Sequence, residues 1–376
     1  MSFSAEYRPH SIVRITLLFL TIMLGLFYYY MGPYRVVALA VYIVGISQYL
    51  VRRPTLKLSQ ILVMFYIILR VLLGVDQIGF VASVFYLRLF WGFLAIYLLF
   101  KVNQIDLRRI FIGLAILTIV EYFAIHLFGG IINYLPNYTQ KDVMFEFYSA
   151  SGWLGGAYSF GGNRTVSGVI LLAVFTLFDQ QNIKGKWLIL AGSLFSLSGV
   201  AIGLTMIYFG ITRFANLKTS LLSSLMVILA LAAFIGLVVL RGDEVFYRIS
   251  LTYLLDFMVD YKISQFMEGI ALLGKSILNL LTGLHVFSSE NIEVSGYGIS
   301  FGDFMALEFF VHYGLVGILM FLLFVLPLIN RANAWPLMIL IAGTFHYGII
   351  FATPGQIVFG YLLSLGVREK RTLKTF

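Results

Sequence analysis

The sequence predicts an all-α, polytopic integral membrane protein in which residues 1–376 form one membrane domain with about 12 transmembrane segments. Two observations predict this fold class. Hydrophobic residues make up 60% of the chain and charged residues only 11%, whereas a soluble domain carries about 25% charged residues. The apolar residues also fall in blocks, and a helix needs about 20 such residues to cross a bilayer. Too few charged side chains remain to cover a globular surface in water.

The apolar blocks give the expected transmembrane segments in order. The first is interpreted as a retained helix, because no small-residue cleavage site follows it. The expected segments are 13–30, 36–51, 58–75, 78–100, 110–129, 165–180, 187–198, 199–213, 219–240, 304–328, 335–352 and 355–367.

The net charge of +9 comes from basic residues placed between the apolar blocks rather than in one stripe. This placement indicates orientation by the positive-inside rule and gives no reason to expect a nucleic-acid partner. The residues expected in the cytoplasm are Arg8, Arg14, Arg52, Arg53, Lys57, Lys101, Arg108, Arg109, Lys184, Lys186, Arg213, Lys218, Arg331, Arg368, Lys370, Arg371 and Lys374. Two long polar segments, 130–164 and 241–303, then fall on the outer face. Within the second, residues 245–283 have the spacing of amphipathic helices lying on the membrane surface.

The stretch 187–213 is long enough for one ordinary span, but it lies between two basic clusters that both favour the cytoplasm. Two hypotheses are therefore open: the stretch is a single span, or it is a pair of short helices that turn at Ser198-Gly199 and return to the same side. In the second hypothesis the non-helical backbone would have to be buried in protein or face water.

Several chemistries are excluded or disfavoured. The chain has no cysteine, so disulfides, thiolate catalysis and Cys-based metal sites are ruled out. No Walker A sequence or Gly-rich nucleotide loop occurs, and no paired-His metal pattern is present. No cofactor and no metal are therefore expected. Ser198 lacks the paired histidine that a serine nucleophile requires.

Charged residues inside the expected spans are candidates for function, since a charge near the bilayer centre is costly and is usually paired or functional. Arg88 is expected near the centre of the fourth span and Glu121 near the centre of the fifth. A short loop joins these spans, so the two residues could form an ion pair that fixes helix packing. Alternatively, Arg88 could bind an anionic lipid headgroup. Arg70 lies nearer its helix end and could simply extend to the interface.

Arg164 in GGNRTVSG lies where the first outer loop meets a helix. A helix start offers unpaired N–H groups and a positive dipole end, and arginine can bind phosphate oxygens through two parallel hydrogen bonds. The simpler alternative is a solvated loop arginine. Arg241 and Arg248 open the second outer loop beside Asp243 and Glu244. One of these arginines could pair locally and leave the other to bind an anion.

Asp303, Glu308 and His312 enter the tenth span from outside, in FGDFMALEFFVHYGLVG. Glu308 and His312 are four residues apart and therefore share a helix face. A carboxylate beside a membrane cavity can act as a general base. The structural alternatives are an N-terminal helix cap for Asp303 and interhelical hydrogen bonding for His312. Aromatic residues in the outer loops could stack on sugar rings, although an interfacial aromatic belt explains most of them.

Four features, in this order, resemble the superfamily of O-antigen polymerases (Wzy) and O-antigen ligases. They are NRTVSG before an apolar helix, LSLSGVAIGL, a long outer loop before the tenth span, and GYGISFGDFMALEFFVHYGLVGILMFL. The resemblance covers residues 150–330 well and the rest only by topology. Asp303-Phe304 stands where ligases carry a His-Asn pair, which favours a polymerase. The Ser-Gly turn lacks the arginine often found there in the family.

The resemblance implies a GT-C-like, metal-independent, inverting glycosyltransferase of the bacterial inner membrane, with its active site facing the periplasm. Its substrates would be oligosaccharides on undecaprenyl pyrophosphate, and the growing glycan would be moved onto the next lipid-linked repeat unit in lipopolysaccharide biosynthesis. Arg164 and Arg248 would bind pyrophosphate, with Arg241 as the substitute for Arg248, and Asp303 would stand at the catalytic position. Membrane lipid is an expected partner, and a chain-length regulator is a further candidate.

Two alternatives stay open. The first is an O-antigen ligase, which would use a lipid A-core acceptor. The second is a flippase or transporter, which would favour inverted repeats and helices broken at the midplane. No repeat is evident in the sequence, and its polar residues gather at the expected outer face.

Overall fold

The computed structural model describes residues 9–27, 34–52, 55–80, 83–84, 87–103, 105–128, 160, 164–196, 198–214, 261–283, 305–345 and 348–372. In these ranges all regular secondary structure is helical and no strand occurs. The all-α part of the prediction is therefore confirmed.

The helices follow the apolar blocks of the sequence. The α-helices are α1 (Pro9–Leu26), α2 (Tyr34–Arg52), α3 (Leu58–Ile78), α5 (Arg88–Asn103), α6 (Arg108–Phe128), α9 (Arg164–Gln180), α10 (Lys186–Phe195), α11 (Gly199–Phe209), α15 (Tyr261–Leu273), α16 (Ile277–Thr282), α18 (Met305–Val325), α19 (Ala334–Thr344) and α20 (Thr353–Thr372). A π-helix, η2 (Gly210–Phe214), continues α11, and two 3-10 turns are η4 (Leu326–Leu328) and η5 (Ile349–Phe351).

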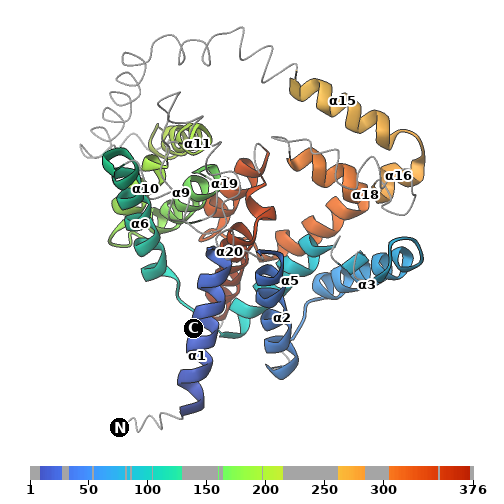
Figure 1. Cartoon of the computed structure of the whole chain (residues 1–376), viewed down its shortest axis with the longest axis horizontal. Helices are drawn as coiled ribbons and strands as arrows, with labels where there is room; N and C mark the ends of the chain where they lie inside the picture. The colour runs from blue at the N-terminus through green and yellow to red at the C-terminus, as the bar shows by residue number, and fades with distance from the viewer. Residues whose placement is uncertain are drawn as a thin grey trace.

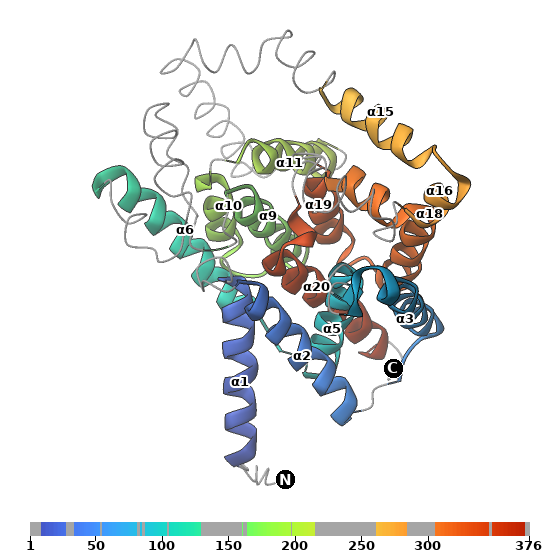
Figure 2. The same cartoon turned by 45° about the vertical axis from the view of Figure 1, so that its right-hand side comes forward.

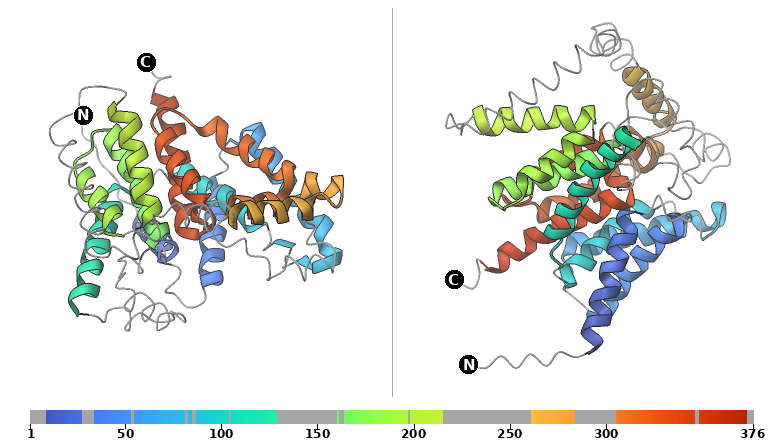
Figure 3. Two further views of the ribbon diagram at one scale, coloured as in Figure 1. Left: turned by 90° about the horizontal axis from the view of Figure 1, so that it is seen from above. Right: turned by 60° about the vertical axis from the view of Figure 1, so that its left-hand side comes forward.

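The helices form three neighbouring groups (Figure 1). One group contains α6, α9, α10 and α11. The central group contains α1, α2, α5 and α20, with α5 packed between α2 and α20. The third contains α3, α15, α16 and α18, and Figure 2 shows α15 at its outer edge. Helix α19 connects the first group to the centre because it packs against both α9 and α20. Figure 3 gives two further views of this arrangement.

Ten of the 12 expected segments coincide with helices, 78–100 does so only from Arg88 onward, and 219–240 lies outside the described residues. Two stretches are long and apolar enough to cross a membrane, Leu58–Val75 in α3 and Ala306–Leu328 in α18 with η4. The described part of the second long segment, 261–283, is helical as expected.

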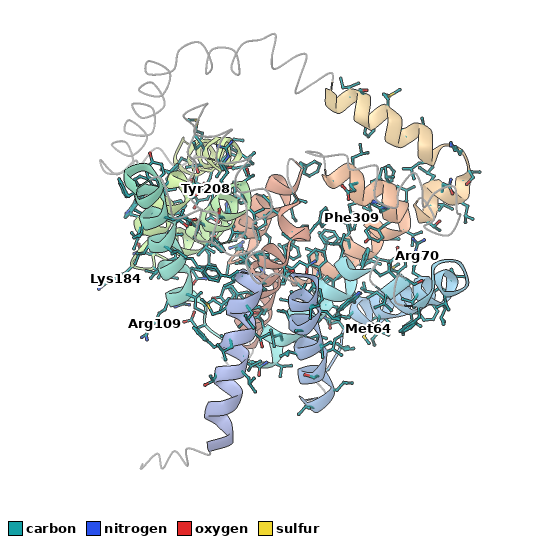
Figure 4. The ribbon with its side chains drawn as sticks, in the orientation of Figure 1. Met64, Arg70, Arg109, Lys184, Tyr208 and Phe309 are labelled. Carbon is teal, nitrogen blue, oxygen red and sulfur yellow. The ribbon has the colours of Figure 1, made fainter. Side chains whose placement is uncertain are left out.

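Helices α10 and α11 form a hairpin whose two open ends meet at Asp179 near the end of α9. The Asp179 carboxylate accepts a hydrogen bond from Lys186 Nζ at 2.9 Å and another from the Tyr208 hydroxyl at 2.9 Å. Lys186 begins α10 and Tyr208 lies at the end of α11, so the chain returns to where it entered (Tyr208 is labelled in Figure 4). The structure therefore confirms the pair of short helices over the single span.

The loops that carry the basic residues gather at one end of the molecule. Lys101 Nζ donates to the Thr55 carbonyl at 2.6 Å, and Lys57 Nζ donates to the Pro327 carbonyl at 3.3 Å. Gly185 lies against Ile112 of α6. The Tyr208 ring meets Trp335, with centroids 5.3 Å apart. These contacts link the loops of Lys57, Lys101, Arg108, Arg109, Lys184, Lys186 and Arg331, which are called the basic end below.

The structure corrects the expected environment of Arg88. It is the first residue of α5 rather than the centre of a span, because no continuous helix covers 78–100. Helix α6 packs on α10, away from α5. The expectation that the helices carrying Arg88 and Glu121 are antiparallel neighbours is wrong.

The Asp179 contacts predict a stability difference between two aspartates. Asp179→Asn removes the charge that binds Lys186, so we expect about 1–3 kcal/mol of destabilisation and a fall of several degrees in the apparent Tm of the purified protein. The control is Asp106→Asn. Asp106 is 3.7 Å from Arg108, its side chain is 62% exposed, and an exposed pair contributes about 0–1 kcal/mol. Equal shifts of Tm in the two variants would contradict the conclusion that Asp179 holds the two ends of the α10–α11 hairpin together.

Candidate functional site

Arg164 begins α9, whose residues Val166–Phe178 are all buried. The Nη1 atom of Arg164 is enclosed by protein, and the Ser167 hydroxyl donates to the Arg164 carbonyl at 3.3 Å. Asp179 marks the other end of α9 at the basic end, so the helix places Arg164 about 22 Å away from it at 1.5 Å per residue. Arg164 therefore combines its own charge with the positive end of a buried helix dipole.

The tip of the α10–α11 hairpin packs on the second turn of α9. The Ser193 hydroxyl donates to the Gly168 carbonyl at 2.7 Å, and the Ser196 hydroxyl donates to the Ser193 carbonyl at 2.6 Å. Ser198 caps α11 by accepting from the Ala201 N–H at 3.3 Å. These serines satisfy backbone groups at the turn, so Ser198 has a structural role here. The turn approaches α9 closely because Gly168 has no side chain.

Glu121 lies at the same end of this helix group. It is 4% exposed within α6, and the ring of the next residue, Tyr122, meets the Phe195 ring at the end of α10 with centroids 5.0 Å apart. Glu121 and Arg164 therefore flank the hairpin tip from two different helices.

The second polar group lies in the first half of α18. His312 Nε2 is 3.8 Å from Glu308 Oε1, which is an ion-pair distance rather than a hydrogen bond. Their side chains are 16% and 24% exposed. The helix breaks two residues later at Gly314, where φ is +62°. The pair therefore lies just before an interruption of an otherwise apolar helix.

The turn between α19 and α20 contacts both helices that carry the two polar groups. On one side, Gly343 packs closely on Val169 of α9 and on Ile349 of η5. On the other side, Phe351 of η5 stacks on Phe309 with centroids 5.6 Å apart and an angle of 9°. Helix α9, which begins at Arg164, and the half of α18 that carries Glu308 and His312 therefore both pack near η5. Phe309 is labelled in Figure 4.

The start of α5 belongs to the same region. The Phe90 ring meets Tyr313 at 5.1 Å and Phe309 at 5.7 Å between centroids. The backbone of Arg88 therefore lies close to the Glu308–His312 helix, although the reason differs from the expected one. Asp303, Arg241 and Arg248 lie outside the described residues.

Three residues at this site were not singled out by the sequence reasoning or were given a different role. Arg70 is 4% exposed and contacts α16 rather than extending to an interface. Tyr66, one turn earlier on α3, is also buried, with its hydroxyl near Gly317. Gly314 breaks α18. The available signals were the spacing of Tyr66 and Arg70 on one face and the Gly-Leu-Val-Gly sequence after His312.

The region combines a cation at the start of a buried helix with a carboxylate–imidazole pair on a second helix. The first suits an anion such as a phosphate, and the second can take a proton from a hydroxyl. Among the described residues, no three His, Asp or Glu side chains converge as metal ligands.

The close contact at Gly168 predicts a difference between two glycines. A Cβ at Gly168 would lie 2.2 Å from Ser196 Oγ and 3.1 Å from Ala201 Cβ, whereas one at Gly203 would meet nothing within 4 Å. We expect Gly168→Val to displace the hairpin tip and cost about 1–3 kcal/mol more than Gly203→Val, seen as a lower apparent Tm. Both variants place valine in a helix, so the loss of helix propensity is the same in each and does not contribute to the difference in stability. Equal stability of the two variants would show that the tip does not rest on Gly168.

Comparison of the chain with protein families, with characterised proteins and with solved structures gave no match.

Proposed function

We propose that this chain is an integral membrane protein of the bacterial inner membrane that polymerises lipid-linked oligosaccharides at the periplasmic face, as the resemblance implies. Separate observations support the membrane setting, the orientation and the chemistry.

The outward faces of the helices support the membrane setting. Helix α3 turns apolar side chains outward, with Phe65 63% and Leu72 65% exposed, whereas Gln60, Tyr66 and Arg70 on its opposite face are buried. A helix at a water-facing surface has the reverse pattern. Lipid favours apolar side chains outside and directs ionisable ones into the protein. Further exposed apolar side chains on α1, α2 and α6 include Leu17, Phe19, Leu39, Ile43, Val120 and Phe123.

The gathering of basic loops supports the orientation. Lys57, Lys101, Lys184 and Arg331 share one end, as the positive-inside rule predicts for cytoplasmic loops. Arg164 and the Glu308–His312 pair lie toward the other end. The proposed chemistry therefore takes place on the periplasmic side.

The observation that supports the proposed reaction is that α9, which begins at Arg164, and the half of α18 that carries Glu308 and His312 both pack near η5. In the proposed step, an acceptor hydroxyl gives its proton to the pair and its oxygen attacks the anomeric carbon of the donor. The bond from that carbon to the diphosphate oxygen breaks, and undecaprenyl diphosphate leaves with the electron pair. Attack opposite the leaving group inverts the anomeric centre. Arg164 would stabilise the charge that develops on the diphosphate.

A specific observation favours transport as the second candidate. Three breaks lie among the packed helices: the turn between α10 and α11, Gly314 within α18, and the turn between α19 and α20. Helices α10 and α19 contain 10 and 11 residues, which reach about half of the roughly 30 Å hydrocarbon core. Broken helices near the midplane are common in transporters.

Single-cysteine labelling tests the membrane setting and orientation. The chain has no cysteine, so Lys184→Cys, Arg331→Cys and Lys275→Cys each introduce one thiol at an exposed position. A membrane-impermeant maleimide added to intact cells with a permeable outer membrane should label Lys275→Cys only, because the basic end faces the cytoplasm. Labelling of all three or of none, with equal labelling after lysis, would contradict the proposed orientation.

Reconstitution with purified lipid-linked repeat unit tests the reaction. We expect long-chain products on undecaprenyl pyrophosphate, and about 100- to 1000-fold slower synthesis for Arg164→Ala. Glu308→Gln and His312→Asn should lose about 100- to 10000-fold if the pair acts as base. Arg109→Ala, exposed at the basic end, is the control and should polymerise normally.

The outcomes separate the alternatives. Transfer only to lipid A-core would identify a ligase, and movement of intact repeat units across vesicles without glycosidic bond formation would identify a transporter. Normal rates for Glu308→Gln and His312→Asn, together with a loss in Asp303→Asn, would move the base to Asp303. Normal long-chain polymer from Arg164→Ala would remove Arg164 from the reaction.

A further inference from the structure

Arg70 lies on the face of α3 that points into the protein, although most residues of α3 are apolar. It is 4% exposed, and Figure 4 shows it between α3 and α18. Its Nη1 donates a hydrogen bond to the carbonyl of Thr282 at 2.9 Å. Burying an arginine is costly, and the cost is recovered only where the charge has well-placed acceptors. The Thr282 carbonyl is such an acceptor.

Thr282 is the last residue of α16. The last carbonyls of a helix have no partner within the helix, and this end carries a partial negative charge. A cation at this position therefore supplies both a donor and a favourable dipole interaction. Helix α16 has only 6 residues, and so short a helix depends on contacts outside itself. Arg70 provides one of them from a different helix.

The residue after Thr282 touches the break in α18 backbone to backbone. Gly283 has φ +83°, and a Cβ there would lie 2.2 Å from the His312 carbonyl oxygen. Gly314 has φ +62°, and a Cβ there would lie 2.3 Å from the Gly283 nitrogen. Only glycine fits both positions. The end of α16 therefore sets where the His312 peptide can lie.

Helix α3 also reaches α18 through Tyr66, which lies on the same face as Arg70, and through Phe90 of α5. The Tyr66 ring meets Phe90 edge-on at 5.2 Å, and Phe90 in turn meets Tyr313 edge-on at 5.1 Å. The Tyr66 hydroxyl lies 3.4 Å from the position of a Cβ on Gly317. Phe90 of α5 therefore links Tyr66 to the first half of α18, and the Tyr66 hydroxyl lies near the second half, while the Arg70 hydrogen bond places the end of α16.

We propose that Arg70 is a positioning residue that holds the end of α16 against the α18 break and thereby fixes the position of the Glu308–His312 pair beside that break. The part of this proposal that concerns turnover rests on the proposed glycosyl transfer, whereas the part that concerns the position of α16 does not. Arg70 would act without touching substrate.

A distance measurement tests the positional part without any assay of activity. Ile277 is 78% exposed on α16 and Leu319 is 52% exposed on α18, so cysteines at these two positions can carry spin labels in a chain that has no other cysteine. We expect one narrow distance population in the labelled parent and a broader or shifted one after Arg70→Met. Arg109→Met, exposed at the basic end, should leave the population unchanged. Identical distributions in the parent and Arg70→Met would overturn the proposal.

A kinetic comparison tests the effect on turnover. Displacing the pair from its place should lower kcat of polymerisation by at least about tenfold and leave KM for the lipid-linked substrate near its original value. Arg70→Lys keeps the charge and one donor, so it should recover part of kcat. A rise in KM with unchanged kcat, or no recovery by lysine while the distances stay unaltered, would overturn the positioning role.

A second variant covers the case in which Arg70→Met does not fold. Gly283→Ala leaves Arg70 intact but brings a Cβ to 2.2 Å from the His312 carbonyl oxygen. It should shift the distance between the spin labels at positions 277 and 319 and lower kcat in the same way. An unchanged distance would count against the proposal. If no preparation transfers sugar, the proposed function fails, while the distance result still decides whether Arg70 holds α16.

Discussion

The structure depends on one constraint: helices that stop inside an apolar interior must have their backbone N–H and C=O groups satisfied there. The described part of the chain meets this constraint with different groups at different breaks. Serine hydroxyls serve the tip between α10 and α11. Arg70 serves the end of α16, where it meets the α18 break. At the end of α19, the Thr344 hydroxyl accepts from the Ile350 N–H at 3.3 Å and donates to the Leu340 carbonyl at 2.8 Å. Each break can persist because its polar groups have local partners.

The same breaks explain why the candidate site is where it is. A continuous apolar helix presents only side chains, whereas a helix end presents a dipole and allows another backbone to approach. Arg164 lies at such an end, and the Glu308–His312 pair immediately precedes one at Gly314. Helix ends occur at the basic end too, but there Lys57 and Lys101 bond to the carbonyls of Pro327 and Thr55 at exposed positions.

The positions of the helices could be predicted from the sequence because apolar block length and flanking charge are local properties. The hairpin of α10 and α11 was one of two readings, and two basic clusters around one apolar stretch favoured it. The neighbours of α5 could not be predicted, because it packs between α2 and α20, which are distant in sequence. For the same reason Arg70 was assigned to the interface: its partner Thr282 is 212 residues away. The spacing of Gly314 and Gly317 is visible in the sequence, but the positive φ of Gly314 depends on its contact with Gly283.

Broken helices alone do not separate a transferase from a transporter, but the tightness of their contacts bears on the choice. Alternating access needs one group of helices to rock against another around the site. Here the Gly283 and Gly314 backbones are in direct contact, and a Cβ on Gly355 would lie 1.7 Å from the Ile349 carbonyl oxygen. The first contact packs the α18 break tightly on the end of α16, and the second makes the turn between α19 and α20 compact. A fixed site is what catalysis requires, because its donors must already point at the charge that develops in the transition state. These close contacts at the α18 break and in the α19–α20 turn are in keeping with the proposed group transfer, in which the site stays fixed.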